Sequence, residues 1–375
     1  MEKIINQTHS KETFLYTLSR LLERGSYYGL RALLILYMTE SILKMELTDA
    51  YRIYSWYIFS LLFSKIIGAL IGDLVIGNKK AIILGGILQA LGAFSFISPS
   101  TIGLYTGLFL IALGSGLYSP NIFSNFGKIY LNKTKLLDAG FAIFYFGTNL
   151  GAFLAIISIG YIGGQYGWNT GFALTGILLL LSIIPVIISK GEQVEETIEK
   201  KANINQRIIN IILALTVVSL FWVIYSIGEI RFFDLQPKFI DISTLDIPEN
   251  LWPYFDLAFI VPISLAAGAI WSFFYYNPFF KLTIGYIFGA MAFAVLFLIP
   301  EIPTEKHLYI YFLSLLLLGI SEIHIAPILF SIITKNSNPK YLAILFGLAA
   351  IPTKLFYGLL NLFVFSVSKK TPIFL

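Results

Sequence analysis

Residues 19–39 read SRLLERGSYYGLRALLILYMT and combine the apolar character of a membrane helix with four charges. The charged residues are Arg20, Glu23, Arg24 and Arg31. A charge at membrane depth costs at least ~2.5–3.5 kcal/mol on insertion scales, so these side chains must face protein or water. At about 100° per residue, Tyr27 and the three arginines fall within about 60° of one another, and the glutamate flanks them. The stretch therefore predicts a membrane helix with one lipid-facing side and one charged side turned inward.

The composition of the whole chain is that of a polytopic membrane protein. Of its 375 residues, 57% are hydrophobic and only 13% are charged, with a mean hydropathy of +0.80. A soluble protein carries about 25% charged residues. The absence of cysteine excludes disulfides and thiolate chemistry, and the three histidines are too far apart in sequence to predict a metal site. Lysines in loops on the inner side of a membrane explain the pI near 9.0 better than nucleic-acid binding does.

About eleven segments reach the length of about 20 mostly apolar residues that a membrane span needs. We expect the spans at residues 14–39, 51–76, 80–98, 101–125, 138–162, 169–189, 208–230, 252–275, 280–300, 308–334 and 341–367. The charged connection at residues 190–207 divides the chain into an N-terminal six-helix bundle, 1–189, and a C-terminal bundle, 208–375. A six-plus-six arrangement would need one more span, so we expect either that the last span is missing or that one of the eleven segments combines two short spans. The predicted fold class is an all-α membrane protein with about 11–12 transmembrane helices.

The distribution of basic residues predicts how the chain is oriented. Lysine and arginine are about twice as frequent on the side that carries the N-terminus and the 190–207 connection, which predicts that this side is cytoplasmic. The first apolar run is interpreted as a retained span, because no small-residue cleavage site follows it. We expect a multi-pass protein of a cell inner or plasma membrane.

A glycine-rich turn closes the second predicted span. Residues 68–80 read GALIGDLVIGNKK, and Asp73 in this turn can cap a helix or pair at the membrane face. The turn resembles the loop signature of the major facilitator superfamily. The arginine that the superfamily places after the aspartate is Leu74 here.

Longer motifs resemble the proton-dependent oligopeptide transporter family of that superfamily. Its first-span signature resembles ERGSYYGLR at residues 23–31, and its fifth-span signature resembles FYFGTNLGA at residues 144–152. Shorter matches lie at residues 114–121, 138–141, 221–222 and 319–327. The resemblance implies a facilitator-type fold of two bundles that takes up di- and tripeptides by symport with protons. A proton gradient would then be the driving force, and no cofactor is expected.

The resemblance also implies a substrate site between the two halves, and the residue types suit that role. Arg31 offers a planar, bidentate donor to a carboxylate. Tyr27 and Tyr28 provide an apolar wall with polar tips, and Asn149 can both donate to and accept from a peptide bond. Glu322, in the opposite half, can meet an amino group or carry a proton.

Proton coupling or gating is expected to involve Glu23, Arg24, Glu322 and Glu229. Two simpler interpretations stay open. Arg24 and Glu23 can be a purely structural ion pair, and Tyr27 and Asn149 can serve only in packing between helices.

Several positions depart from the family pattern. Arg20 replaces the first glutamate of the opening signature, and Ser119 replaces the fourth-span lysine. An arginine cannot hand on a proton near neutral pH as a carboxylate can. Ser226 stands near the place of an expected acidic residue in the seventh span, and Glu229, about one turn later, is its candidate replacement. The sequence thus predicts altered coupling machinery.

Three functions are compatible with the sequence. The first is proton symport of small peptides, and the second is facilitated transport or export of another carboxylate-bearing molecule, which the extra charge of Arg20 favours. The third is a non-transporting, receptor-like or degenerate member of the family. An enzyme is not expected, because no nucleophile–base pair, metal cluster or phosphate-binding loop is visible. We expect a monomer whose partners are a small solute and the lipid bilayer, without nucleic acid.

Overall fold

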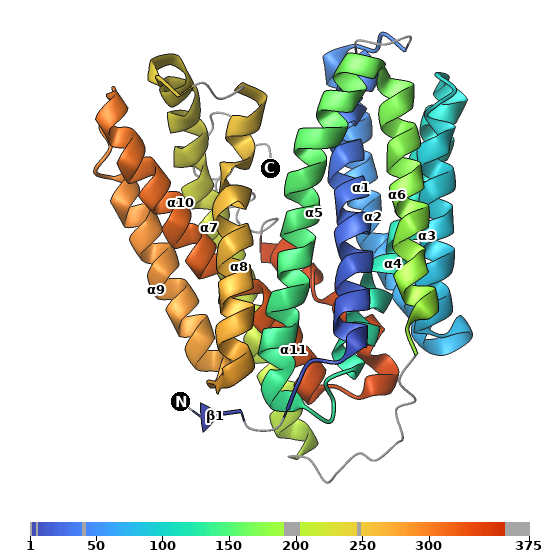
Figure 1. Ribbon diagram of the computed structural model, residues 1–375, viewed down its shortest axis with the longest axis vertical. Coiled ribbons are helices and arrows are strands. Elements are labelled where there is room, and N and C mark those ends of the chain that lie inside the picture. The colour runs from blue at the N-terminus through green and yellow to red at the C-terminus, as the bar shows by residue number, and fades with distance from the viewer. Residues whose placement is uncertain (1, 5–6, 40–42, 191–202, 246–248, 357–375) are drawn as a thin grey trace.

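The chain folds into two groups of long helices that stand side by side (Figure 1). The computed structural model describes residues 2–4, 7–39, 43–190, 203–245 and 249–356. Almost all of these residues are helical, so the expected all-α fold is confirmed.

The first group contains six long helices, and the second begins with α7. The first six are α1 (Lys11–Thr39), α2 (Leu47–Ile71), α3 (Asn78–Ser95), α4 (Thr101–Lys128), α5 (Leu137–Tyr166) and α6 (Trp168–Ile188). The others are α7 (Ile204–Ile242), α8 (Phe255–Phe273), α9 (Pro278–Leu296), α10 (Leu308–Ile323), α11 (Ala326–Asn336) and α12 (Leu342–Leu348). Two short strands, β1 (Glu2–Lys3) and β2 (Phe274–Tyr275), complete the described elements together with single turns of 3-10 or π helix.

Nine helical segments of the described chain are long and apolar enough to cross a membrane. The two remaining long helices of the first half, α1 and α3, are not among the nine, and α1 is the helix with the charged stripe. The chain is therefore a multi-pass membrane protein. The predicted last span, 341–367, is described only as far as residue 356, and most of the predicted linker, 190–207, lies outside the described residues.

Two expected helix boundaries are corrected. The seventh span was expected at 208–230, but α7 continues to Ile242 because ion pairs one turn apart extend the helix beyond its apolar part. Asp234 pairs with Arg231 at 2.6 Å and with Lys238 at 3.0 Å.

The second correction concerns the tenth span, which was expected to be one helix over 308–334. It is instead broken into α10 and α11 at His324 and Ile325. Pro327 lacks an amide hydrogen and disfavours helical geometry at the preceding residue, which explains the break.

The first half is held together by very close approaches of backbone. A Cβ atom on Gly151 of α5 would lie 2.1 Å from the carbonyl oxygen of Leu21 in α1, so only glycine allows these helices to pack as they do. Small residues at such crossings are typical of helix association in lipid. This crossing fixes α1, and with it the charged stripe, against α5.

The hydrogen bonds and ion pairs that join the two halves gather toward one end of the molecule. We call it the lower end; it is where α1, α5 and α9 begin, at the bottom of Figure 1. Here β1 pairs antiparallel with β2, and the amide of Ile4 donates to the carbonyl oxygen of Phe273 at 2.9 Å. The N-terminal segment therefore reaches across to the loop between α8 and α9.

Candidate functional site

The charged stripe of α1 forms a compact cluster around one fully buried carboxylate. Arg24 binds Glu23 with two nitrogens, Nε at 2.7 Å and Nη2 at 2.5 Å, and Nη1 of Arg20 donates to the same carboxylate at 3.0 Å. A buried carboxylate needs such partners because an unpaired one would be strongly destabilising. The ion pair of Arg24 with Glu23, which the sequence left as an alternative to a coupling role, is therefore present.

Arg20 and Ser119, the two departures from the family pattern, lie beside this cluster. Nη1 of Arg20 is 3.5 Å from the Ser119 hydroxyl, and the guanidinium lies 4.9 Å from the ring centre of Phe123. The side chain of Arg20 is almost completely buried. Arg20, Glu23, Arg24 and Ser119 are thus brought together in one cluster.

Lys65 is a further member of the cluster that sequence reasoning missed. It lies in α2, is half-buried, and interacts electrostatically with Glu23, Arg20 and Arg24. The cluster therefore holds three positive charges against one negative charge. A lysine inside a predicted apolar span is itself the signal that could have revealed it.

Arg31 lies two turns above the cluster and is exposed. Its guanidinium carbon is 5.7 Å from the ring centre of Tyr54, and no carboxylate of the described residues lies within ion-pair distance of it. Tyr27 and Tyr28 pack edge to face with ring centres 5.3 Å apart, and Arg24 covers the Tyr27 ring at 4.4 Å. The three predicted binding residues of α1 are thus adjacent, and Arg31 is available to a ligand.

Glu322 faces the first half across the centre of the molecule. The hydroxyl of Tyr145 in α5 donates to its Oε1 at 2.5 Å, which joins the two halves at this depth. Tyr145 lies within the motif at residues 144–152 and is not among the predicted site residues. Asn149, one turn along α5, is buried and donates to the Tyr145 carbonyl oxygen at 3.0 Å, so one of its amide hydrogens is used within its own helix.

Two more carboxylates belong to the neighbourhood of Glu322. Glu229 of α7 and Asp256 of α8 both interact electrostatically with it. Oδ1 of Asp256 is buried and has no hydrogen-bond partner in the described part of the chain. Among the residues that the structure describes, no group of three or more acidic or histidine side chains could hold a metal ion. The second half therefore contributes negative charge to the centre.

Below this level, a buried ion pair connects the halves directly. Nζ of Lys281 in α9 lies 2.6 Å from Oδ2 of Asp138 in α5, and both side chains are only 2% exposed. The hydroxyl of Ser331 in α11 donates to the other carboxylate oxygen, and the Lys281 ammonium lies 3.9 Å from the ring centre of Trp271. Every charge at this point is matched across the boundary between the halves.

The glycine-rich turn makes a second connection at the lower end. Oδ1 of Asp73 accepts from the side-chain amide of Asn78 at 2.8 Å, and Oδ2 accepts from the backbone amide of Ile344 in α12 at 2.9 Å. The expectation that Asp73 caps a helix is confirmed, and the helix that it caps lies in the other half. A carboxylate is favourable there because the first amides of a helix are unpaired.

Comparison with known proteins explains this arrangement. The family description "Major Facilitator Superfamily" matches residues 17–353. The chain belongs to that superfamily. The match includes most of both groups of helices, the central cluster and, at the lower end, the contacts of Asp138 and Asp73.

Among curated proteins, those similar to this chain include peptide transporters. It is 33% identical over 222 residues to the uncharacterized transporter YclF of Bacillus subtilis, a match that covers 56% of this chain and 45% of that protein. It is 29% identical over 240 residues to a di-/tripeptide transporter of Lactococcus lactis, covering 60% of this chain and 48% of that protein. The chain spans about half the length of the curated relatives it matches.

Solved structures of similar fold come from the same group of transporters. A POT family transporter in complex with 5-aminolevulinic acid has a TM-score of 0.64 at 21% identity, covering 95% of this chain and 92% of that chain. A peptide transporter POT in complex with sulfate has a TM-score of 0.62 at 22% identity, covering 96% and 90%. These two likenesses show the fold. Together with the di-/tripeptide transporters, they confirm the resemblance to the oligopeptide transporter family that the motifs predicted.

Proposed function

We propose that this protein is a secondary transporter that takes up small peptides, such as di- and tripeptides, across the membrane by symport with protons. It has no enzymatic role in this proposal, and it works as a monomer embedded in the bilayer. The similarity to di-/tripeptide transporters supports the substrate class, and the family resemblance supports the proton gradient as the driving force.

One observation carries the proposal: the two halves bring opposite charges to the centre. The first half contributes Arg31 and the surplus cations around Glu23, and the second half contributes Glu322, Glu229 and Asp256. A peptide carries a carboxylate at one end and an ammonium at the other, so it fits between such halves in one orientation. Arg31 binds the carboxylate in a bidentate manner, and Tyr27, Tyr28 and Asn149 line the space between the ends.

Transport in this proposal alternates access between two bundles, 1–189 and 208–375, joined by the linker 190–207. The N-terminus and the linker lie on the cytoplasmic side of the cell membrane, as the distribution of basic residues favours. The arrangement that the structure describes, joined at its lower end, then corresponds to a state closed toward the cytoplasm. Uptake requires the Asp138–Lys281 connection to break in each cycle.

Coupling is assigned to Glu23, Arg24, Glu322 and Glu229. Glu322 is the proton carrier, because its only described side-chain hydrogen bond comes from Tyr145 of the other half and is lost when the halves separate. Glu23 is held by two arginines and serves as a fixed anchor for Arg24. Arg20 replaces a carboxylate, so fewer groups in α1 can exchange a proton than the family pattern has.

Uptake by the purified full chain in liposomes tests the proposal. Labelled dipeptide should accumulate faster with an inward proton gradient than without one. Replacement of Glu322 by Gln should abolish the gradient dependence and leave exchange between internal and external peptide intact. Equal uptake with and without the gradient in the unmodified protein would show that symport is wrong.

The surplus of positive charge in the cluster supports a second candidate, a facilitator or exporter of a more anionic carboxylate. Three cations surround one carboxylate, which favours a solute with more than one negative charge. A competition assay with dipeptides against di- and tricarboxylates separates the two functions. Binding of a labelled tricarboxylate that excess dipeptide does not displace would favour the second candidate.

A further inference from the structure

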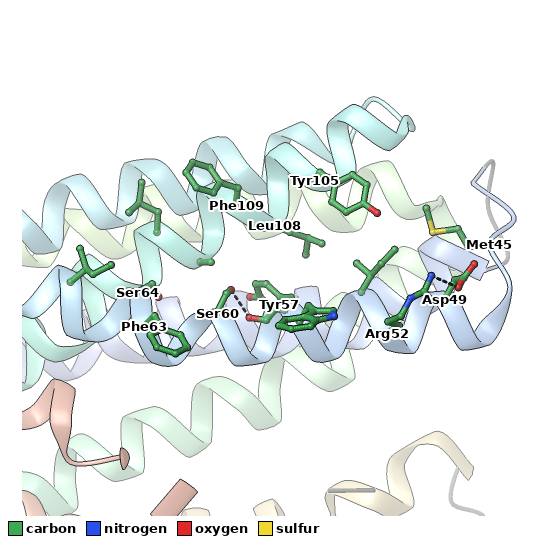
Figure 2. A pocket seen from close by; sticks show the side chains of 15 residues that line it. Met45, Asp49, Arg52, Tyr57, Ser60, Phe63, Ser64, Tyr105, Leu108 and Phe109 are labelled. Carbon is green, nitrogen blue, oxygen red and sulfur yellow. Dashed lines mark hydrogen bonds and ion pairs between the residues drawn. The ribbon is translucent and has the colours of Figure 1, made fainter. Parts of the chain in front are cut away.

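A groove between α2 and α4 lies on the opposite side of α2 from the central cluster. The two helices touch where a Cβ on Gly68 would lie 2.2 Å from the carbonyl oxygen of Gly116, and where one on Gly116 would lie 2.2 Å from that of Ser64. Toward the upper end, away from the N-terminus, the helices separate. They leave a cavity of about 750 Å³, which Figure 2 shows from close by.

The walls of this groove are apolar and aromatic. They come from both helices, with Trp56 and Phe63 on α2 and Tyr105 and Phe109 on α4. Trp56 is 66% exposed and Phe109 is 64% exposed, so these surfaces face the lipid in a membrane protein. In a bilayer, these exposed apolar side chains of the groove contact lipid acyl chains.

A charged pair lies at the upper end of the groove. Nη2 of Arg52 is 2.8 Å from Oδ1 of Asp49, and the two side chains are 71% and 48% exposed. Charges so exposed belong at the surface of the bilayer, and Trp56, about one turn deeper, is the residue type enriched at that interface. The upper end of the groove therefore lies at headgroup level.

The part of the groove between Arg52 and Phe63 matches one leaflet in length. Eleven residues separate Arg52 from Phe63, which in an α-helix corresponds to a rise of about 16 Å. Half of a hydrocarbon core that is about 30 Å thick is about 15 Å. An acyl chain that begins at Arg52 would therefore reach Phe63, and the lining of the groove continues to Ser64 and Ile67, where the helices come close together.

We propose that this groove binds one phospholipid whose headgroup carries both a phosphate and a primary ammonium. Arg52 binds the phosphate, because its planar guanidinium matches the phosphate oxygens in a bidentate manner. Asp49 accepts hydrogen bonds from the ammonium, and the acyl chain lies between α2 and α4. The exposed Asp49–Arg52 pair contributes little to folding, so it can exchange its internal contact for the headgroup.

The pairing of opposite charges selects this headgroup over two others. A lipid with only a negative headgroup would leave Asp49 unmatched and close to the phosphate. A lipid with a quaternary ammonium has no N–H group to donate to Asp49. The site thus distinguishes phosphatidylethanolamine from phosphatidylglycerol and from phosphatidylcholine.

Native mass spectrometry of the full chain tests the proposal directly. The purified protein is incubated with an equimolar mixture of phosphatidylethanolamine, phosphatidylglycerol and phosphatidylcholine that have identical acyl chains. The ethanolamine lipid should be retained at least about threefold over each of the others, as expected for one additional charge-assisted contact, from its ammonium to Asp49. Asp49→Asn should remove the preference over choline, and Arg52→Gln should reduce retention of all three lipids.

Two further variants separate the groove from a general effect of charge. Asp234→Asn is the matched control, because Asp234 forms an ion pair of the same spacing with Arg231 on α7 and does not line the groove. It should leave lipid retention unchanged. Ser60→Trp fills the groove below the headgroup and should lower ethanolamine-lipid retention without touching the charged pair. Equal retention of the three lipids, preference for the glycerol lipid, or equal loss in Asp234→Asn and Asp49→Asn would overturn the proposal.

Discussion

The centre of the molecule and its lower end contain similar charged groups but pair them differently. At the lower end, Asp138 of the first half binds Lys281 of the second at 2.6 Å, and both are buried. At the centre, Glu23 is satisfied by Arg20 and Arg24 from its own helix. The halves are joined at that depth by the hydrogen bond from Tyr145 to Glu322.

The charge that the first half contributes also has the opposite sign in the two regions. At the lower end the first half supplies the carboxylates Asp138 and Asp73, whereas at the centre it supplies the surplus of cations. Charges that are matched across the boundary hold the halves together. Charges at the centre that have no partner in the other half can instead bind a zwitterionic solute.

Breaking the lower pair should have the largest effect. Asp138→Ala leaves Lys281 buried without a partner, which costs about 3–5 kcal/mol in comparable buried pairs. We expect the lower end to open. Because the chain has no cysteine, Thr334→Cys, at a position 1% exposed and facing Gly127 of the other half, provides a reporter. Its labelling rate by a water-soluble thiol reagent should rise strongly with Asp138→Ala.

The double variant Asp138→Leu with Lys281→Met is the control for that experiment. It removes both charges and keeps apolar side chains of similar volume, which in other buried pairs is close to neutral. Labelling of the reporter should therefore return toward its original rate. A rate that is unchanged by Asp138→Ala alone would mean that the pair does not hold the lower end closed.

Removing the charge of Arg31 at the centre should have the second largest effect, a loss of peptide affinity. Arg31→Ala removes a charge-assisted bidentate contact worth about 1.5–3 kcal/mol, so peptide affinity should fall about 10- to 100-fold. Isothermal titration with a dipeptide measures this loss. A dipeptide with an amidated C-terminus should bind the unmodified protein and the variant almost equally, and an equal loss for both peptides would argue against a carboxylate contact.

Reversing the charge at position 20 should have a smaller effect, on the preference of the central site for anionic solutes over dipeptides. Arg20→Glu gives two carboxylates against Arg24 and Lys65, so the cluster becomes neutral. We expect the ratio of tricarboxylate to dipeptide affinity to fall about threefold to tenfold, as for the loss of a nearby charge in a partly solvated site. Arg20→Gln, which only removes the charge, should have an intermediate effect in the same competition assay.

The smallest expected effect concerns His9, which bridges the halves below the buried pair. Its ring nitrogens lie 2.8 Å from the hydroxyl of Tyr130 and 2.8 Å from that of Ser272. Burial, and then the positive charge of Lys133, lower the pKa of His9 below its usual value of 6.5. The neutral form is therefore favoured in the joined state, so the bridge is fully present above about pH 6.5 and is lost as the pH falls toward the lowered value.

Labelling of the Thr334→Cys reporter between pH 7.5 and 5.5 measures this effect, after correction for the intrinsic thiol reaction rate on a free cysteine peptide. The corrected rate should rise modestly at the acidic end. His9→Gln keeps a hydrogen-bonding side chain that does not titrate, and it should flatten the dependence. A pH dependence that persists in His9→Gln would assign the effect to another group.

Much of the centre could be predicted from the sequence, because its signals lie within single helices. The helical period placed Arg20, Arg24 and Tyr27 on one face of α1, and a charge inside a membrane span requires a partner or water. Whether Arg31, Tyr27, Tyr28, Asn149 and Glu322 bind a solute stays a prediction.

The connections between the halves could not be predicted in the same way. Tyr145 and Lys281 meet their partners across 177 and 143 residues of sequence, and such distances are set by tertiary packing rather than by helical period. Lys65 was missed because it stands alone in an otherwise apolar span. The extension of α7 and the break before α11 also depend on local contacts that an average hydropathy does not record.

The break between α10 and α11 limits how much of the molecule must move when the lower end opens. Helix α10 packs on α8 and α9 within its own half, whereas α11 also lies against α4 and α5 of the other half. At this point the α-helical bonding is replaced by a tighter turn, in which the amides of His324 and Ile325 donate to the carbonyl oxygens of Ser321 and Glu322. The junction can therefore act as a hinge between the two pieces. When the Asp138–Lys281 connection breaks and the halves separate, the 11 residues of α11, with Ser331, can therefore change their angle to α10 while Glu322 keeps its place on α10.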